Sequence, residues 1–325
     1  MPDPEIAGLI DRFRHGDRRA LARLISRIES GSTDPALEAL LDEAPPQPIL
    51  GFTGPPGVGK STLVASLVGL YCAQSLDVGI VAVDPTSPLT GGAVLGDRIR
   101  MKGLYLENKV FFRSMGSRGA AGGLAHQTQN VVRLLAAFGK TRILVESVGV
   151  GQGEVGICDV ADTRILVKVP GLGDGVQAIK AGVLEVADIY VVNKADRPGA
   201  DRLIGELHGV LALDAMPGDW TPPILSTVAL EGQGVEALDE AIHQHQNYLA
   251  ESGEGDRRRA QKREREFVGL IEEDARRRLR GALSSGGPLE QTFAAVREGG
   301  ITPRRAAREA LAQWNFQNPS SRQRP

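Results

Sequence analysis

Residues 54–61 read Gly-Pro-Pro-Gly-Val-Gly-Lys-Ser, which matches the pattern G-x-x-x-x-G-K-S at every fixed position. The apolar run Ile49–Thr53 before it is typical of a buried strand. After it, Leu63, Leu67 and Leu70 have helical spacing, with Ser66 among them. Strand, glycine-rich loop and helix therefore follow one another in the order of a P-loop, and the stretch predicts binding of a nucleoside triphosphate.

The chemistry of phosphate explains these residue types. Glycines let the backbone approach phosphate oxygens closely, and successive N–H groups beside a helix N-terminus form an anion-binding nest. Lys60 can reach the β- and γ-phosphates, and the Ser61 hydroxyl can bind Mg²⁺. The predicted phosphate-binding residues are Gly54, Gly57, Val58, Gly59, Lys60, Ser61 and Thr62.

Composition narrows the class of protein. The 325 residues predict one large domain with appendages, or two domains. A net charge of −2 gives no support to a nucleic-acid or membrane-surface partner. Two isolated cysteines form no disulfide framework or metal motif. No signal peptide or run of 18 apolar residues is present, so we expect a cytoplasmic protein without a membrane partner.

Periodicity divides the chain into three segments. Residues 1–45 form an amphipathic helical extension that ends in a proline-rich linker. Residues 46–250 alternate strand and helix patterns and predict an α/β domain with a doubly wound, mostly parallel sheet. Residues 251–325 predict a helical region and a disordered tail. The expected strands are Ile49–Thr53, Val78–Val83, Val110–Arg113, Ile143–Glu146, Arg164–Val169, Ile189–Asn193 and Pro223–Ser226.

Carboxylates follow two of the predicted strands, at the edge where such folds bind ligands. Asp84 ends the second strand, and Asp97 lies in the glycine-containing segment that follows. Glu146 ends another strand and precedes Ser147-Val-Gly-Val-Gly-Gln152. Glu146 can bind Mg²⁺ through water or orient the attacking water, while the Gly149 N–H can sense the γ-phosphate. The alternatives are an Asp-Pro turn at Asp84 and a loop that is glycine-rich only for turning.

The sequence Asn193-Lys194-Ala195-Asp196 at a strand end indicates the base. A buried carboxylate of Asp196 can accept hydrogen bonds from N1–H and the 2-amino group of guanine, which adenine cannot supply. Asn193 and Lys194 hold the loop and flank the base. After the next strand, the segment Val228-Ala229-Leu230-Glu231 is placed to offer backbone N–H groups to guanine O6, with Val228 and Ala229 as the predicted site residues. GTP is therefore predicted rather than ATP.

Residues 256–280 are rich in arginine, which could indicate RNA binding. Acidic residues interleave with the arginines, and Phe267, Leu270, Ile271 and Leu279 share one face. The pattern favours a solvated or dimer-packing helix.

Together these segments resemble the MeaB/ArgK family, the GTPases associated with B12-dependent methylmalonyl-CoA mutase. The resemblance covers roughly residues 45–250 plus the helical extensions. Its further markers are Val83–Ser87, Gly91–Met101, Arg113–Gly119, Glu146–Gln152, Pro170–Asp174, Gln177–Lys180 and Asn193–Asp196.

The resemblance implies specific roles. Lys60, Ser61, Asp84, Asp97 and Glu146 would form the Mg²⁺ and phosphate site. Lys180 would join the catalytic residues Lys60, Glu146 and Gly149, and it lies with Asp174 and Gln177 in a switch that signals to the mutase. Members are homodimers with slow GTP turnover that gate adenosylcobalamin loading and protect or rescue the mutase. GTP or GDP with Mg²⁺ is the implied ligand set, and a B12-dependent acyl-CoA mutase is the implied partner.

Departures from the family pattern concentrate near the switch. Ser147 and Gly153 replace residues in the sensor loop, and Gly175 and Ala181 replace polar or charged residues beside Asp174 and Lys180. Methylmalonyl-, isobutyryl- and ethylmalonyl-CoA mutases all stay open as partners. Rival functions are a P-loop kinase or transport-linked phosphotransferase, a nickel-insertion GTPase, and a scaffold without turnover. The sequence offers no acceptor base for the first and no Cys/His metal site for the second.

Overall fold

The computed structural model describes residues 3–32, 34–84, 109–116, 123–147, 160–171, 187–214, 220–284 and 286–313. The chain divides into two compact units, Met1–Glu266 and Phe267–Pro325. The helix α11 (Glu254–Leu283) contributes to both.

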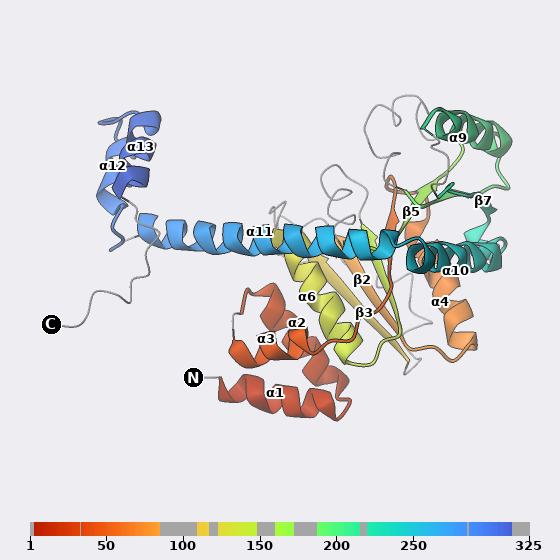
Figure 1. Cartoon of the computed structure of the whole chain (residues 1–325), viewed down its shortest axis with the longest axis horizontal. Helices are drawn as coiled ribbons and strands as arrows, with labels where there is room; N and C mark the ends of the chain where they lie inside the picture. The colour runs from red at the N-terminus through yellow and green to blue at the C-terminus, as the bar shows by residue number, and fades with distance from the viewer. Residues whose placement is uncertain are drawn as a thin grey trace. The chain divides into compact units, whose positions relative to one another are not determined.

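A seven-stranded sheet forms the centre of the first unit (Figure 1). The strand order is β3-β2-β4-β1-β5-β6-β7, and every neighbouring pair is parallel. The predicted α/β fold is therefore confirmed, and the sheet is parallel throughout. The strands are β1 (Ile49–Thr53), β2 (Val78–Asp84), β3 (Val110–Gly116), β4 (Arg142–Ser147), β5 (Thr163–Lys168), β6 (Ile189–Asn193) and β7 (Ile224–Thr227).

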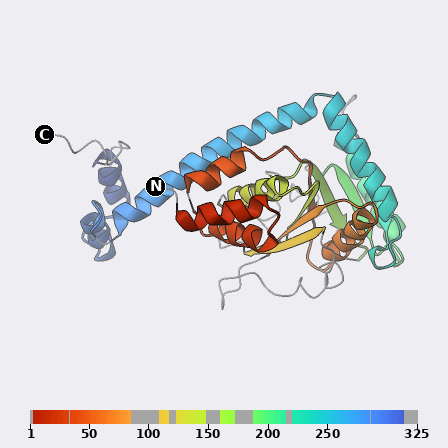
Figure 2. The same ribbon diagram turned by 90° about the horizontal axis from the view of Figure 1, so that it is seen from below.

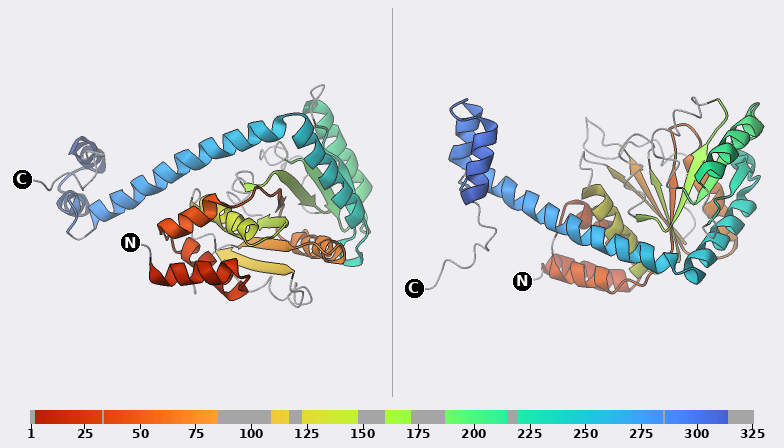
Figure 3. Two further views of the ribbon diagram at one scale, coloured as in Figure 1. Left: turned by 60° about the horizontal axis from the view of Figure 1, so that its bottom comes forward. Right: turned by 45° about the horizontal axis from the view of Figure 1, so that its top comes forward.

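Helices cover both faces of the sheet, as the nearly continuous apolar strands require. On one face, α4 (Lys60–Ala73), α10 (Val235–Glu251) and the short helix η3 (Ala229–Glu231) pack on the central strands. On the other face, α6 (Gly123–Ala137) covers β2 and β4. The helix α9 (Ala200–Asp214) packs against β6 and β7 on that second face. It lies at the end of the sheet away from the N-terminal helices (Figure 3). Because β1 lies between β4 and β5 at the centre, the loop that follows β1 is flanked by strand ends on both sides.

The N-terminal helices form an outer layer on α6 (Figure 2). They are α1 (Pro4–Arg14), α2 (Arg18–Glu29) and α3 (Pro35–Asp42). Each begins after an aspartate whose side chain accepts a backbone N–H of the first turn, namely Asp3, Asp17 and Asp34. Arg18 donates to Val110 O (2.5 Å), and the Arg113 Nε donates to Glu29 (2.9 Å). These contacts attach the layer to the edge strand β3.

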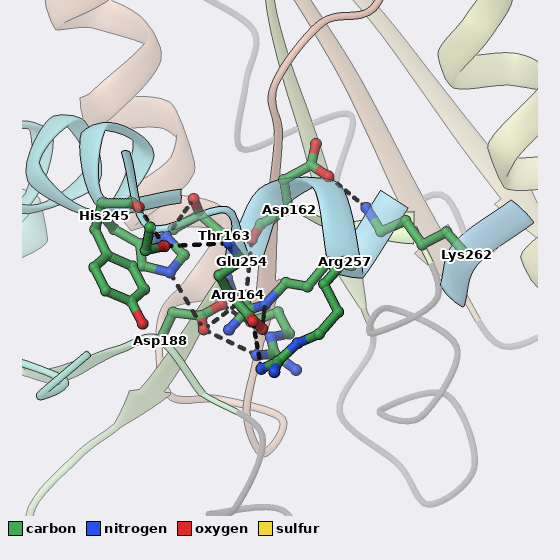
Figure 4. Close-up of polar contacts among 11 residues, drawn as sticks. Asp162, Thr163, Arg164, Asp188, His245, Glu254, Arg257 and Lys262 are labelled. Atoms are coloured by element: carbon green, nitrogen blue, oxygen red, sulfur yellow. Dashed lines mark hydrogen bonds and ion pairs between the residues drawn. The ribbon is translucent and has the colours of Figure 1, made fainter. Parts of the chain in front are cut away.

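The first turns of α11 are bound to the sheet by partly buried ion pairs (Figure 4). Asp188, just before β6, accepts from Arg164 Nη2 (2.9 Å) and Arg258 Nη1 (3.0 Å), and His245 Nε2 lies 3.4 Å away. Burial alone would raise the pKa of Asp188, but hydrogen bonds from Arg164 and His245 hold it well below its usual value. Lys262 donates to Asp162 (2.5 Å), and burial lowers the pKa of Lys262.

A third contact continues this attachment along α11. Glu266 accepts two hydrogen bonds from Arg133 of α6, at 2.7 and 2.9 Å, in the bidentate geometry that gives carboxylate recognition its specificity. Part of the arginine-rich stretch therefore binds the α/β domain, where the sequence favoured a solvated or dimer-packing helix.

The second unit consists of the remainder of α11, α12 (Glu290–Arg297) and α13 (Pro303–Gln313). Ala282, Leu289 and Ala306 are buried, and α12 contacts α13. Several large apolar side chains are exposed, namely Phe267, Val268, Leu270, Ile271, Leu279, Phe293 and Leu311. In the described part of the chain, no helix combines the length and apolarity that crossing a membrane requires.

Candidate nucleotide-binding site

The loop between β1 and α4 takes a backbone conformation that requires glycine. Gly54, Gly57 and Gly59 have φ of 137°, 81° and 92°. A Cβ on Gly54 would lie 2.2 Å from Val167 O of β5, and one on Gly59 would lie 2.5 Å from Asn193 Nδ2. Gly54 and Gly59 are therefore required for two reasons: their φ angles are positive, and a side chain would collide with a neighbouring strand or residue.

Lys60 is the first residue of α4, directly after the N-cap Gly59. Its side chain is buried and turns back over the loop, where the ammonium donates to Gly54 O (2.7 Å) and Pro55 O (3.1 Å). The two carbonyls fix a positive charge within the loop that the sequence assigns to phosphate.

Ser61 and Glu146 are brought together from α4 and β4. The Ser61 Oγ donates to Glu146 Oε1 (2.7 Å), and both side chains are buried. The pairing of Phe52 in β1 with Glu146 in β4 sets this proximity, because the P-loop alone separates β1 from α4. A hydroxyl and a carboxylate are hard oxygen donors, so this pair fits the chemistry of Mg²⁺. Behind it, Ser147 Oγ donates to Thr53 Oγ1 (3.1 Å).

Asn193 at the end of β6 links the predicted base-binding segment to the P-loop. Its Nδ2 donates to Val58 O (2.9 Å), while its Oδ1 accepts from Thr227 Oγ1 and from the Ala229 N–H, both at 3.1 Å. Lys194, whose φ is 56°, donates through Nζ to Gly57 O (2.8 Å). The two predicted loops are thus one connected arrangement at the carboxyl ends of the strands.

The remaining base-binding residues differ in part from expectation. The side chain of Asp196 is exposed, whereas the sequence predicts a buried carboxylate. A carboxylate at the surface keeps its hydration until a ligand covers it, so selectivity would arise on binding. The Val228 N–H donates to Gln233 O (3.1 Å) and the Ala229 N–H to Asn193. Both predicted donors therefore already have acceptors within the protein.

Some predicted residues lie outside the described part of the chain, namely Asp97, Gly149 and Lys180, together with Asp174 and Gln177 of the expected switch. Asp84 is the last residue of β2, but its side chain also lies outside the described part of the structure. Thr62 is partly buried on α4.

The structure adds three hydroxyl groups that the sequence reasoning did not assign to the site. Thr53 supports Ser147, Thr227 supports Asn193, and Ser66 donates to Ala229 O (2.6 Å). Single serines and threonines carry no motif, and only their position next to a strand end or on α4 could have indicated a role.

Comparison with known proteins agrees with this arrangement. Residues 21–284 match the family model described as methylmalonyl-CoA mutase-associated GTPase MeaB. A putative GTPase of Pyrococcus horikoshii is 46% identical over 283 residues, covering 85% of this chain and 89% of that protein. The GTPase ArgK of Escherichia coli is 32% identical over 318 residues, covering 94% and 95%.

A solved structure gives the same result for the fold. The crystal structure of an LAO/AO transport system kinase aligns with a TM-score of 0.65 at 26% identity, covering 96% of this chain and 98% of that one. The family match spans the P-loop and the segment Asn193–Asp196. The chain belongs to the MeaB family of methylmalonyl-CoA mutase-associated GTPases.

Proposed function

We propose that this GTPase is Mg²⁺-dependent and serves as chaperone and regulator of a B12-dependent acyl-CoA mutase of the methylmalonyl-CoA mutase type. In this role it gates adenosylcobalamin loading and protects or reactivates the mutase. The family description supports the partner class. The observation that carries the chemistry is the buried hydrogen bond between Ser61 and Glu146 beside Lys60.

Each residue of this group has a distinct role in the proposal. Lys60 contacts the β- and γ-phosphates, exchanging its bonds to Gly54 O and Pro55 O for phosphate oxygens. Glu146 accepts a hydrogen bond from the attacking water or from a water on the metal, and Gly149 and Lys180 complete the catalytic set. Ser61, Asp84, Asp97 and Glu146 would hold Mg²⁺, which supplies positive charge for the developing phosphate oxyanions.

The base specificity is assigned to the loops that Asn193 connects. Asp196 would accept from the N1–H and 2-amino groups of guanine, with Lys194 beside the base. Its exposure in this structure supports that role, because the carboxylate is open to a ligand.

The C-terminal helical region, residues 251–325, is proposed to form a homodimer. The exposed apolar residues of α11 support this, since Phe267 and Ile271 are four positions apart and lie on one side of the helix.

The runner-up is a kinase that passes the γ-phosphate to an acceptor hydroxyl, because the protein in the similar crystal structure is named a transport system kinase. We favour hydrolysis because the matched family and the similar sequences are described as GTPases.

The test is GTP turnover with and without the B12-dependent mutase of the same host. We expect slow hydrolysis alone, stimulation on adding the mutase, and loss of both with EDTA. Lys60→Ala should abolish both rates, while Lys109→Ala, which removes an exposed lysine bound to Ser75 O, should change neither. A GTP turnover rate that the mutase does not change would contradict the proposal. So would a pull-down of this protein from its host that recovers a hydrogenase or urease maturation complex instead of a mutase.

A further inference from the structure

A hydrogen bond connects the P-loop helix to the segment after β7. The Ser66 Oγ of α4 lies 2.6 Å from Ala229 O in η3 and 3.1 Å from Thr62 O one turn earlier in its own helix. A hydroxyl has one hydrogen to donate, and Ala229 O is the nearer acceptor. Ser66 therefore ties α4 to η3 through a main-chain carbonyl.

The peptide bond whose carbonyl Ser66 binds also carries the N–H group of Leu230. The Ala229 carbonyl and the Leu230 N–H belong to one planar peptide unit, which is trans. Fixing the carbonyl direction therefore fixes the direction of the Leu230 N–H, which points the opposite way within the same plane. Among the described residues, no acceptor atom is hydrogen-bonded to this N–H.

The other polar groups around Ala229 already have hydrogen-bond partners, and the Gly232 N–H donates a second, longer bond (3.4 Å) to Ala229 O. The Ala229 side chain is buried in the core beneath η3, and the Ala229 N–H donates to Asn193 Oδ1. The Val228 N–H is bound to Gln233 O. The Leu230 side chain, in contrast, is 87% exposed. The Leu230 N–H is thus the donor of this segment that an incoming acceptor can take without breaking a bond.

We propose that Ser66 is a positioning residue for base recognition, which orients the Ala229–Leu230 peptide so that the Leu230 N–H binds guanine O6. This rests on the guanine site proposed above and narrows the O6 donor from the segment Val228–Glu231 to the N–H of Leu230. Ser66 itself touches neither base nor phosphate.

The experiment compares three diphosphates, because these bind without hydrolysis. GDP has the full guanine edge, IDP keeps O6 but lacks the 2-amino group, and 6-thio-GDP replaces O6 by a weakly accepting sulfur. Dissociation constants are measured by titration with wild type, Ser66→Ala and Ser66→Thr. Ser30→Ala is the matched control, because it removes a hydroxyl that donates to Arg27 O at the end of α2, far from the site in the sequence.

Ser66→Ala should weaken GDP and IDP alike, by roughly three- to tenfold, the worth of one positioned hydrogen bond. Binding of 6-thio-GDP should change less than about twofold, because its sulfur accepts only weakly from the N–H that Ser66 positions. Ser66→Thr keeps the hydroxyl and should retain wild-type preference, and Ser30→Ala should match wild type for all three ligands.

Two results would overturn the inference. An equal loss for all three diphosphates would mean that Ser66 only supports the fold, and unchanged GDP affinity would mean that the contact positions nothing. Wild type is compared for GDP and ADP in the same series. If wild type binds GDP and ADP equally well, the guanine site itself is rejected. If wild type prefers GDP but Ser66→Ala gives either result above, only the role of Ser66 is rejected.

Discussion

Asn193 connects the two segments of the proposed nucleotide site through hydrogen bonds of its side chain. It is buried, and its amide joins the P-loop at Val58 O to the segment after β7 at Thr227 and Ala229. All of these bonds come from one planar group, so a shift of its side chain would disturb the P-loop and the segment after β7 together. The short distance that a Cβ on Gly59 would have to Asn193 Nδ2 shows how little room this amide has.

Replacing Gly59 by alanine should therefore damage the site more than its backbone angle alone predicts. The new Cβ would lie 2.5 Å from Asn193 Nδ2, which must give up Val58 O. We expect the free energy of unfolding to fall by about 2–4 kcal/mol and GDP to bind at least about tenfold more weakly. Urea denaturation and nucleotide titration measure the two effects.

The matched control is Gly139→Ala. Gly139 has a similar φ of 89°, but a Cβ there meets nothing within 4 Å. It should cost only the backbone strain, about 1–2 kcal/mol, with GDP affinity unchanged. Equal effects of the two substitutions on GDP binding would show that the contact with Asn193 is unimportant.

At this scale, the sequence predicts residues that belong to long motifs and misses isolated hydroxyls. Lys60, Ser61 and Glu146 can be predicted from their motifs. The structure pairs Ser61 with Glu146 and places the Lys60 ammonium on loop carbonyls. Thr53, Ser66 and Thr227 cannot, because their partners come from elements distant in the chain.

At the scale of elements, the start of α11 is held by charges rather than by an apolar stripe. Asp188 accepts hydrogen bonds from two arginines, and Arg258 is the one that α11 supplies. A buried carboxylate of this kind stabilises only while its partners remain, since breaking such a pair leaves an uncompensated charge.

Asp188→Asn should lower the free energy of unfolding at pH 7 by about 3–5 kcal/mol. The pH dependence follows from the lowered pKa of Asp188. As pH falls below the unfolded pKa of about 4, the unfolded chain binds a proton and the folded chain does not, so the stabilisation declines. The difference between wild type and variant should therefore shrink in acid.

Chemical denaturation at pH 7 and at successively lower pH measures this difference. Asp256→Asn serves as control, because its partner Arg259 and its own carboxylate are exposed, and it should change stability by less than about 0.5 kcal/mol. A gap between wild type and Asp188→Asn that stays constant down to acid pH would contradict the assignment.

Helices and strands are largely predictable from local patterns, and their arrangement is not. Aspartate caps indicate α1 to α3, and apolar runs indicate the strands. The order β3-β2-β4-β1-β5-β6-β7 depends on which strands pair, which no local pattern records. The contacts of the start of α11 with the sheet could not be predicted, because its charge pattern is the same whether the partners are water or carboxylates of the sheet.

At the scale of the whole molecule, the two units present different surfaces. The first buries its apolar side chains around the sheet, whereas the second leaves Phe267, Val268 and Ile271 exposed on α11. Each such side chain stabilises by about 1.5–3 kcal/mol when fully buried, so a second copy covering them would be held firmly.

Phe267→Asp combined with Ile271→Asp should convert a dimer to a monomer, because charge would enter the proposed interface. Sedimentation velocity measures the mass. Arg276→Asp, which introduces the same charge at an exposed polar position of α11, should leave the dimer intact. A wild type that sediments as a monomer at micromolar concentration would reject the proposed homodimer.

Guanine recognition by Asp196 is tested most directly by exchanging the base. Asp196→Asn keeps the shape of the side chain but can donate to the xanthine 2-oxo group, which the carboxylate repels. Competition binding with GTP, XTP and ATP should show wild type preferring GTP over ATP by at least about tenfold. The variant should lose GTP affinity and gain XTP affinity. Equal wild-type affinity for ATP and GTP, or no shift toward XTP in the variant, would contradict the account.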